Sequence, residues 1–226
     1  MRLKFLFNSN SKPINKPLNE EVNGFLNKVL GENNKYHGNF SRYSVSSMQG
    51  GNMNKKGIIN FPKGGYIFIS SDDYEFLGAV MKGISTSKED LYVMDMKYVK
   101  MEICDFMLNE KFDLVRTISP LMISANGKNL TFKDSDFTNV LIDKSIKKLV
   151  NCGYDEKIAK TINIKLFHPE NAKTKMVEIG NAKNIANRVM LYVEGNKKAR
   201  KALYELGLGK CTGFGFGAVN INNNNF

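Results

Sequence analysis

Gly207-Leu208-Gly209-Lys210-Cys211-Thr212-Gly213-Phe214-Gly215-Phe216-Gly217 holds five glycines in eleven positions near the end of the chain. Glycine in a regular element costs roughly 0.5–1 kcal/mol relative to alanine, so this cluster indicates that the backbone itself is the working part. The segment follows a helical pattern and precedes a short apolar strand pattern. Its glycines permit positive φ angles and let backbone N–H groups approach an anion, with Lys210 inside the loop. The stretch predicts contact with a phosphate backbone or close packing of two domains, and is less typical of a simple turn.

The charge balance indicates an anionic partner. The chain has 226 residues, with 33 Lys and Arg against 22 Asp and Glu, for a net charge of +11. The segment 160–210 alone carries eleven basic and four acidic residues. This excess points to a polyanion, and the length suffices for one large domain or two of about 100 residues each.

Cysteine usage predicts a cytoplasmic protein without cofactors. Cys104, Cys152 and Cys211 are widely spaced, and no CxxC pair accompanies the two histidines. Such spacing favours neither a zinc site nor a disulfide framework. No apolar run reaches membrane-spanning length and no signal-peptide pattern follows Met1, so we expect no membrane partner.

Hydrophobic periodicity predicts an α+β fold of two tandem ferredoxin-like (RRM-like, βαββαβ) domains packed together. We place the boundary at 112/113, giving an N-terminal domain 1–112 and a C-terminal domain 113–226. The first half is expected to contain strands at 3–7, 43–48, 65–70 and 91–106, with helices at 19–31 and 72–83. The second is expected to contain strands at 114–124, 161–167, 175–179, 189–193 and 216–221, with helices at 135–150 and 197–206.

Helix-end signals add three local expectations. Asn19 is expected to cap the first helix, because Glu20 and Glu21 follow it in the first turn. Asp72 with Glu75 forms a pattern typical of a capping box for the second helix, and Gly83 is expected to end it.

The glycine segment has the form G-h-G, five residues, G-h-G, where h is hydrophobic. At the C-terminal end, between a helix and a last strand, it resembles the signature of the CRISPR repeat-processing endoribonucleases of the repeat-associated mysterious protein superfamily. Three further features fit the same resemblance: a strand at Met1, a histidine-bearing segment followed by the strand 40–47, and the stretch Thr117 to Pro120 that opens the second half.

This resemblance implies metal-independent cleavage of CRISPR precursor RNA within its repeats, which yields mature guide RNAs. A 2′-hydroxyl attacks the adjacent phosphate and leaves a 2′,3′-cyclic phosphate and a 5′-hydroxyl. The implied partners are CRISPR repeat RNA and other CRISPR effector subunits, and a homodimer stays open. The alternatives are a non-catalytic RNA-binding subunit of an effector complex and an RNA-binding module outside CRISPR biology. Nucleotide-binding glycine patterns do not match in register, which disfavours a small-molecule enzyme.

The family's histidine after the first helix corresponds by position to His37. Such chemistry needs a base, an acid and positive charge near the phosphate, and a histidine pKa of about 6.5 suits the first two roles. We hypothesise that His37 is the base or acid, that Lys35 or Arg42 steadies the developing charge, and that Tyr36 or Tyr43 hydrogen-bonds or stacks. The alternative is a surface histidine without a role.

RNA contacts are expected along the glycine segment and at basic residues of the C-terminal half. Lys144, Lys147 and Lys148 are interpreted instead as a solvated helix face, and His168 as an ordinary loop histidine. The expected RNA-binding residues are Gly207, Gly209, Lys210, Gly213, Gly215, Gly217, Lys173, Lys175, Lys197 and Arg200.

Overall fold

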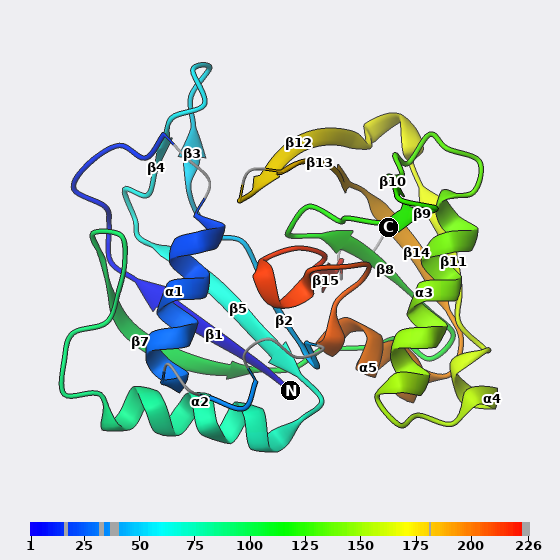
Figure 1. Ribbon diagram of the computed structural model, residues 1–226, viewed down its shortest axis with the longest axis horizontal. Helices are drawn as coiled ribbons and strands as arrows, with labels where there is room; N and C mark the ends of the chain where they lie inside the picture. The colour runs from blue at the N-terminus through cyan, green and yellow to red at the C-terminus, as the bar shows by residue number, and fades with distance from the viewer. Residues whose placement is uncertain (16–17, 32–33, 37–40, 181, 223–226) are drawn as a thin grey trace.

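A computed structural model describes residues 1–15, 18–31, 34–36, 41–180 and 182–222. Figure 1 shows two sheets side by side, each with helices on one face, and the red loop 207–217 between the two halves. This confirms the predicted α+β class with tandem ferredoxin-like units. In the described part of the chain, no helix combines the length and apolar character needed to cross a membrane.

The N-terminal half follows the order βαββαβ with a hairpin inserted between its second and third main strands. Its sheet has the order β2-β5-β1-β7-β6, and all of its pairs are antiparallel. The elements are β1 (Arg2–Phe7), α1 (Asn19–Leu30), β2 (Tyr43–Val45), β3 (Asn52–Met53), β4 (Ile59–Asn60), β5 (Gly65–Ser71), α2 (Tyr74–Thr86), β6 (Tyr92–Val93) and β7 (Met96–Cys104).

The C-terminal half repeats this topology. Its sheet has the order β11-β14-β8-β15, so the second and third main strands again lie on one side of the first and the fourth on the other. The elements are β8 (Phe112–Thr117), β9 (Ser124–Ala125), β10 (Lys128–Asn129), α3 (Phe137–Asn151), α4 (Glu156–Ala159), β11 (Asn163–Phe167), η1 (Pro169–Asn171), β12 (Lys173–Ile179), β13 (Ala182–Arg188), β14 (Met190–Glu194), α5 (Lys197–Leu206), η2 (Thr212–Phe214) and β15 (Val219–Ile221). The domain boundary at 112/113 stays a prediction.

Each half has its own apolar core between sheet and helices. In the first, Phe5 and Phe7 project from β1 onto Phe25 of α1, with ring centroids 5.8 and 5.3 Å away in edge-to-face contact. In the second, Leu141 of α3 and Leu203 of α5 are fully buried against the sheet. The alternation in β1 and the helical spacing in α3 and α5 supply these faces directly.

A buried arginine ties the two halves together. The Arg2 guanidinium donates to Ser70 Oγ at 2.8 Å within its own sheet and to the Val219 carbonyl at 2.6 Å in the other. It also lies over the Phe68 and Phe106 rings, at 4.6 and 4.1 Å from their centroids. Burial lowers the pKa of Arg2 to about 9, still high enough to keep the bridging charge at neutral pH.

The helix-end expectations are corrected in three places. α1 begins at Asn19 itself, and the Asn19 side chain makes no cap hydrogen bond. Asp73, not Asp72, caps α2 by accepting from the backbone N–H groups of Glu75 and Phe76. α2 continues past Gly83 to Thr86. The absence of a side chain at Gly83 instead lets α1 and α2 pack together, because a Cβ there would collide with the Val29 carbonyl. Gly83 therefore lies at the contact between α1 and α2 and does not end α2.

Candidate nucleic-acid interface

The glycine loop, residues 207–217, is a tight excursion between α5 and β15. Gly207 ends α5 with φ 74°, and the Leu208 N–H donates to the Gly217 carbonyl at 2.9 Å, so the two arms of the loop touch. Gly217 has φ 63°, and a side chain there would collide with the Leu208 carbonyl. The glycines thus allow backbone-to-backbone contact in a conformation that other residues adopt at a cost.

The loop also packs on the N-terminal half. Asn19 Nδ2 donates to the carbonyls of Phe214 and Gly215 at 3.2 and 3.3 Å, and Thr212 Oγ1 donates to the Tyr43 carbonyl at 3.0 Å. The side chain expected to cap α1 therefore anchors this loop instead. These hydrogen bonds favour the domain-packing alternative for most of the loop.

Exposure divides the loop into a packed part and an open part. Gly207, Gly213, Gly215 and Gly217 are buried by the protein, whereas Gly209 and Lys210 are partly exposed and Cys211 is exposed. Within this loop, a ligand therefore has most access to the segment 209–211, and the buried glycines shape the turn that presents it.

Replacing Gly217 with alanine is expected to destabilise the protein by about 2–4 kcal/mol, because left-handed strain adds to a backbone collision. Gly153→Ala is the matched control, since Gly153 has φ 87° but nothing within 4 Å of the added carbon. Urea unfolding of both variants separates the collision from the strain. Equal destabilisation of the two would contradict the close approach of the loop arms.

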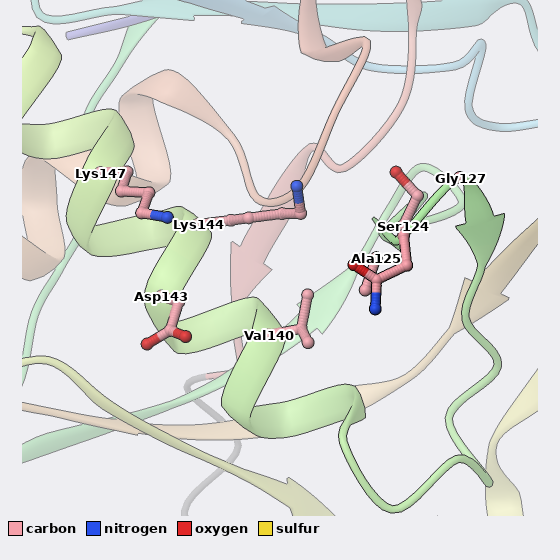
Figure 2. Close-up of a pocket in the computed structure, with 8 residues that line it drawn as sticks. Ser124, Ala125, Gly127, Val140, Asp143, Lys144 and Lys147 are labelled. Atoms are coloured by element: carbon pink, nitrogen blue, oxygen red, sulfur yellow. The ribbon is translucent and has the colours of Figure 1, made fainter.

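The open part of the loop borders a basic cleft, which is the candidate site. Two adjoining hollows, of about 490 and 350 Å³, share Lys144 and Lys147 of α3. Figure 2 shows Lys144 reaching from α3 towards the β9–β10 hairpin, while Asp143 points away from it. The inner hollow is lined by Ser41, Lys144, Lys147, Lys148, Asn151, Gly209, Lys210, Cys211 and Thr212.

The cleft has the charge and form of a phosphate-binding groove. Within the described residues, Lys144, Lys147 and Lys210 have no carboxylate within ion-pair distance. Unpaired ammonium groups beside partly exposed backbone create a positive potential that attracts a polyanion. Lys144 and Lys147 were interpreted from sequence as a solvated face; tertiary folding brings them to the glycine loop.

Lys148 lies at the floor of this cleft. Its ammonium group donates to the carbonyls of Gly207 and Leu206, at 2.9 and 3.4 Å, where α5 ends. Burial lowers its pKa to about 8, so the group is mostly protonated at neutral pH and adds positive charge below the cleft. Its position on the stripe of Phe137, Leu141 and Ser145 was the available sequence signal of burial.

The described residues on both sides of the segment 37–40 meet at one aromatic ring. Residues 37–40, which include His37, lie outside the described part of the chain. Tyr36 packs edge-to-face on Phe76 of α2 with centroids 5.0 Å apart, and Tyr43 stacks on the same ring at 4.3 Å. The two tyrosines, which flank residues 37–40 in the sequence, thus pack on the same ring, and Ser41 lines the inner hollow.

The two cations proposed beside His37 have carboxylate partners. Lys35 Nζ lies 2.8 Å from Glu75, which raises the pKa of Lys35 and lowers that of the exposed Glu75. Arg42 donates to both Asp72 oxygens, at 2.9 and 3.0 Å, and this pairing raises the pKa of Arg42. Asp72 also accepts from the Tyr154 hydroxyl at 2.8 Å, so the Arg42 pair joins the two halves.

The four remaining residues predicted to contact RNA lie in two different places, with Lys173 and Lys175 near the glycine loop and the other two on α5. Lys173 and Lys175 lie on β12, whose hairpin with β13 packs on Phe214 and Phe216 of the glycine loop through Val177. Figure 1 shows this hairpin extending towards the N-terminal half. Lys173 and Lys175 therefore stay proposed RNA contacts at one side of the loop.

The other two predictions lie at the far end of α5. Lys197 is exposed and forms an ion pair with Glu110, at the opposite end of the helix from Gly207. Arg200 is a correction, because its side chain is 0% exposed and pairs with the equally buried Asp113. It also donates to the carbonyls of Gly195, Asn109 and Glu110, and its burial keeps the guanidinium away from RNA.

The remaining candidates are a metal site and the second histidine, His168, considered within the described segments. The described segments contain no group of three His, Cys, Asp or Glu residues that could hold a metal ion. His168 is exposed, and its Nδ1 lies 2.6 Å from Glu170 on the connection between β11 and β12.

Comparison with known proteins identifies relatives. Residues 104–221 match the family model described as CRISPR associated protein Cas6, C-terminal. A repeat-associated (RAMP) protein that binds different RNA substrates has a TM-score of 0.80 and 18% identity, covering 99% of this chain and 100% of its own. The product of a Cas6-related gene from Pyrococcus furiosus has a TM-score of 0.81 and 18% identity, and the match covers 100% of this chain and 99% of that one. A CRISPR-associated protein Cas6 has a TM-score of 0.76 and 21% identity, and the match covers 98% of this chain and 99% of that one. A search of curated proteins gives no match at the sequence level.

Proposed function

This chain belongs to the family of CRISPR-associated Cas6 proteins, and from that premise we propose that it cleaves CRISPR precursor RNA within the repeats to produce guide RNAs. Family membership supports a role in CRISPR RNA binding and processing. The observation that carries the proposal is the basic cleft, whose inner hollow is lined by Ser41 and by Lys144, Lys147 and Lys210. Because His37 precedes Ser41 by only four positions in the sequence, we assign the cleavage of RNA held in this cleft to that histidine.

The proposed reaction is a transesterification within the RNA that needs no metal ion. The 2′-hydroxyl of one nucleotide loses its proton to a base and attacks the adjacent phosphorus, while an acid protonates the departing 5′-oxygen. The products are a 2′,3′-cyclic phosphate and a 5′-hydroxyl. We assign His37 to one of the two proton transfers, because imidazole exchanges protons near neutral pH.

The residues around His37 receive narrower roles. Tyr36 and Tyr43 support the segment through their shared contact with Phe76, rather than reacting with RNA. The Arg42 side chain is 44% exposed, so it can face the phosphate while it keeps Asp72. Lys35 is more exposed and pairs with Glu75 on the surface, which makes it the weaker candidate for steadying charge.

The deciding experiment incubates RNA-free protein with 5′-labelled repeat RNA in excess EDTA. The expected result is a single cut whose 5′ product resists phosphatase until its cyclic phosphate is opened. His37→Ala should lower the cleavage rate at least ~100-fold, since a general acid or base contributes about 10²–10⁴-fold. His168→Ala is the matched control and should cleave normally. Cleavage by His37→Ala at the wild-type rate would remove His37 from the mechanism.

A second candidate function is RNA binding without cleavage. It is supported by the similarity to the repeat-associated protein that binds different RNA substrates, with coverage of nearly the whole of both chains. This alternative uses the same cleft but not His37. Tight binding of repeat RNA by wild-type protein, with no cut under any condition, would favour it over the nuclease.

A further inference from the structure

The Arg42 guanidinium is held along one edge and is open along the other. Its Nε and Nη2 atoms donate to the two Asp72 oxygens, whereas within the described part of the chain Nη1 donates to no acceptor. The side chain is 44% exposed. A guanidinium presents its N–H groups in a planar fork that matches two oxygens of a phosphate. The open edge, which carries Nη1, can therefore bind an RNA phosphate while the other edge stays on Asp72.

Asp72 has a fixed position at the junction between β5 and α2. It lies between Ser71, the last residue of β5, and Asp73, which caps α2, and its side chain is 6% exposed. Ser71 Oγ donates to the Arg42 carbonyl at 2.6 Å and accepts from the Asp73 N–H at 2.9 Å. Both the main chain and the side chain of Arg42 are thus tied to one junction. A side chain that is ordered in advance loses less rotamer freedom when it binds a ligand.

Tyr154 adds a tie from the C-terminal half. Its hydroxyl donates to Asp72 Oδ2 at 2.8 Å, the oxygen that also accepts from Arg42 Nη2. Its backbone N–H donates to the Leu149 carbonyl of α3 at 3.1 Å, and α3 is the helix whose lysines line the basic cleft. Burial and then the Asp72 carboxylate raise the pKa of Tyr154, so the hydroxyl keeps its proton and stays a donor at neutral pH. Tyr154 therefore fixes the Arg42–Asp72 pair relative to the cleft lysines.

We propose that Asp72 and Tyr154 are positioning residues that direct the open edge of Arg42 at the phosphate that is cleaved. This inference rests on the proposed function, in which Arg42 steadies the charge that develops on that phosphate. Asp72 is nearly buried and has the same sign of charge as a phosphate, so it acts through Arg42 and not by touching RNA. A charged donor that is misplaced by ~1 Å stabilises a transition state much less, because this stabilisation depends on preorganised geometry.

The test compares single-turnover cleavage of labelled repeat RNA by wild type, Tyr154→Phe and Asp72→Asn. Tyr154→Phe removes one hydroxyl and should lower the rate constant about tenfold, with an affinity for RNA within about twofold of wild type. Asp72→Asn should lower the rate constant at least as much, because an amide offers one acceptor oxygen where the pair with Arg42 uses two. A loss of folded protein lowers the amplitude of the reaction and leaves the rate constant unchanged, so the two effects separate. Tyr192→Phe, on β14 outside the basic cleft, is the matched control and should cleave normally.

A double-mutant cycle tests whether Tyr154 acts through Arg42. Arg42→Ala should lower the rate constant roughly 100-fold, the effect of removing one donor to a developing negative charge. Adding Tyr154→Phe to Arg42→Ala should then change the rate constant no further, since the positioned group is gone. Losses that multiply in the double variant, or a Tyr154→Phe protein that cleaves at the wild-type rate, would overturn the proposal.

A readout that needs no cleavage separates this proposal from the proposed function. The NMR signal of the Arg42 Nε–H group, assigned by its absence in Arg42→Ala, should shift when repeat RNA is added to wild type and should shift less in Tyr154→Phe. A shifted signal without any cut would refute the nuclease while Arg42 remains positioned at an RNA phosphate. An unmoved signal in a wild type that does cut would overturn the positioning role alone.

Discussion

Asp113→Ala is expected to lower the free energy of unfolding by about 3–5 kcal/mol, a large share of the ~5–15 kcal/mol of a typical domain. The Asp113 carboxylate is fully buried and accepts from Arg200, from the Tyr204 hydroxyl at 3.0 Å and from the Asn109 N–H at 2.8 Å. Removing it leaves the Arg200 guanidinium uncompensated in the core. Burial is the largest cause of the raised pKa of Tyr204 and persists in the variant, so that hydroxyl stays neutral and cannot replace the lost charge.

The magnitude is checked by urea unfolding monitored by circular dichroism, with two comparisons. The double variant Asp113→Leu/Arg200→Met should lose less stability than Asp113→Ala, because no orphan charge remains. Glu110→Ala, which breaks the exposed pair with Lys197, should leave the unfolding midpoint nearly unchanged. An Asp113→Ala protein within ~1 kcal/mol of wild type would contradict the burial of this pair.

Replacing Lys144, Lys147 and Lys210 together with alanine is expected to weaken repeat-RNA binding roughly 100-fold near physiological salt. Each lysine that neutralises a phosphate of a single strand contributes about 0.7 to the slope of log affinity against log salt. The triple variant should therefore bind with a slope shallower by ~2. Filter binding or fluorescence anisotropy over a salt series measures both quantities.

The matched control for this variant removes the same total charge elsewhere. Lys157 on α4, Lys160 directly after that helix and Lys165 on β11 are exposed and lie outside the basic cleft. Their triple alanine variant should retain the wild-type slope and nearly all of the affinity. Equal losses in the two triple variants would show that only the net charge of the protein matters, and the cleft would then have no special role.

Much of the fold was predictable because its signals are local. The limits of α5 at Lys197 and Leu206 were predicted to the residue, since Asn196 caps its start and Gly207 ends it. The βαββαβ order of the first half followed from the periods of 2 and 3.6 in successive segments, and the second half was predicted to repeat it loosely. The strand β13 was missed, because Ala182–Arg188 is mostly polar on both faces and has no apolar alternation to reveal it.

The candidate site was less predictable because it is assembled from distant segments. Arg200 looks like a surface cation in a basic run, yet its partner Asp113 is 87 positions away. Its placement near a helix N-terminus opposes the helix dipole and indicated some outside reason for the charge. That reason is a buried carboxylate and not RNA. The spacing of residues along α5 alone cannot tell whether Arg200 pairs with a buried carboxylate or with RNA.

The sequence by itself determined the secondary-structure order, the tandem fold, the positive charge and the special character of the segment 207–217, because periodicity, composition and glycine spacing act over a few residues. Only the tertiary structure decided which lysines converge with Lys210 and which glycines are buried. It also turned Asn19 from an expected cap into an anchor of the glycine loop. The physical reason is that burial and electrostatic pairing depend on what each side chain meets across the fold, and that neighbour is fixed only when both halves pack together.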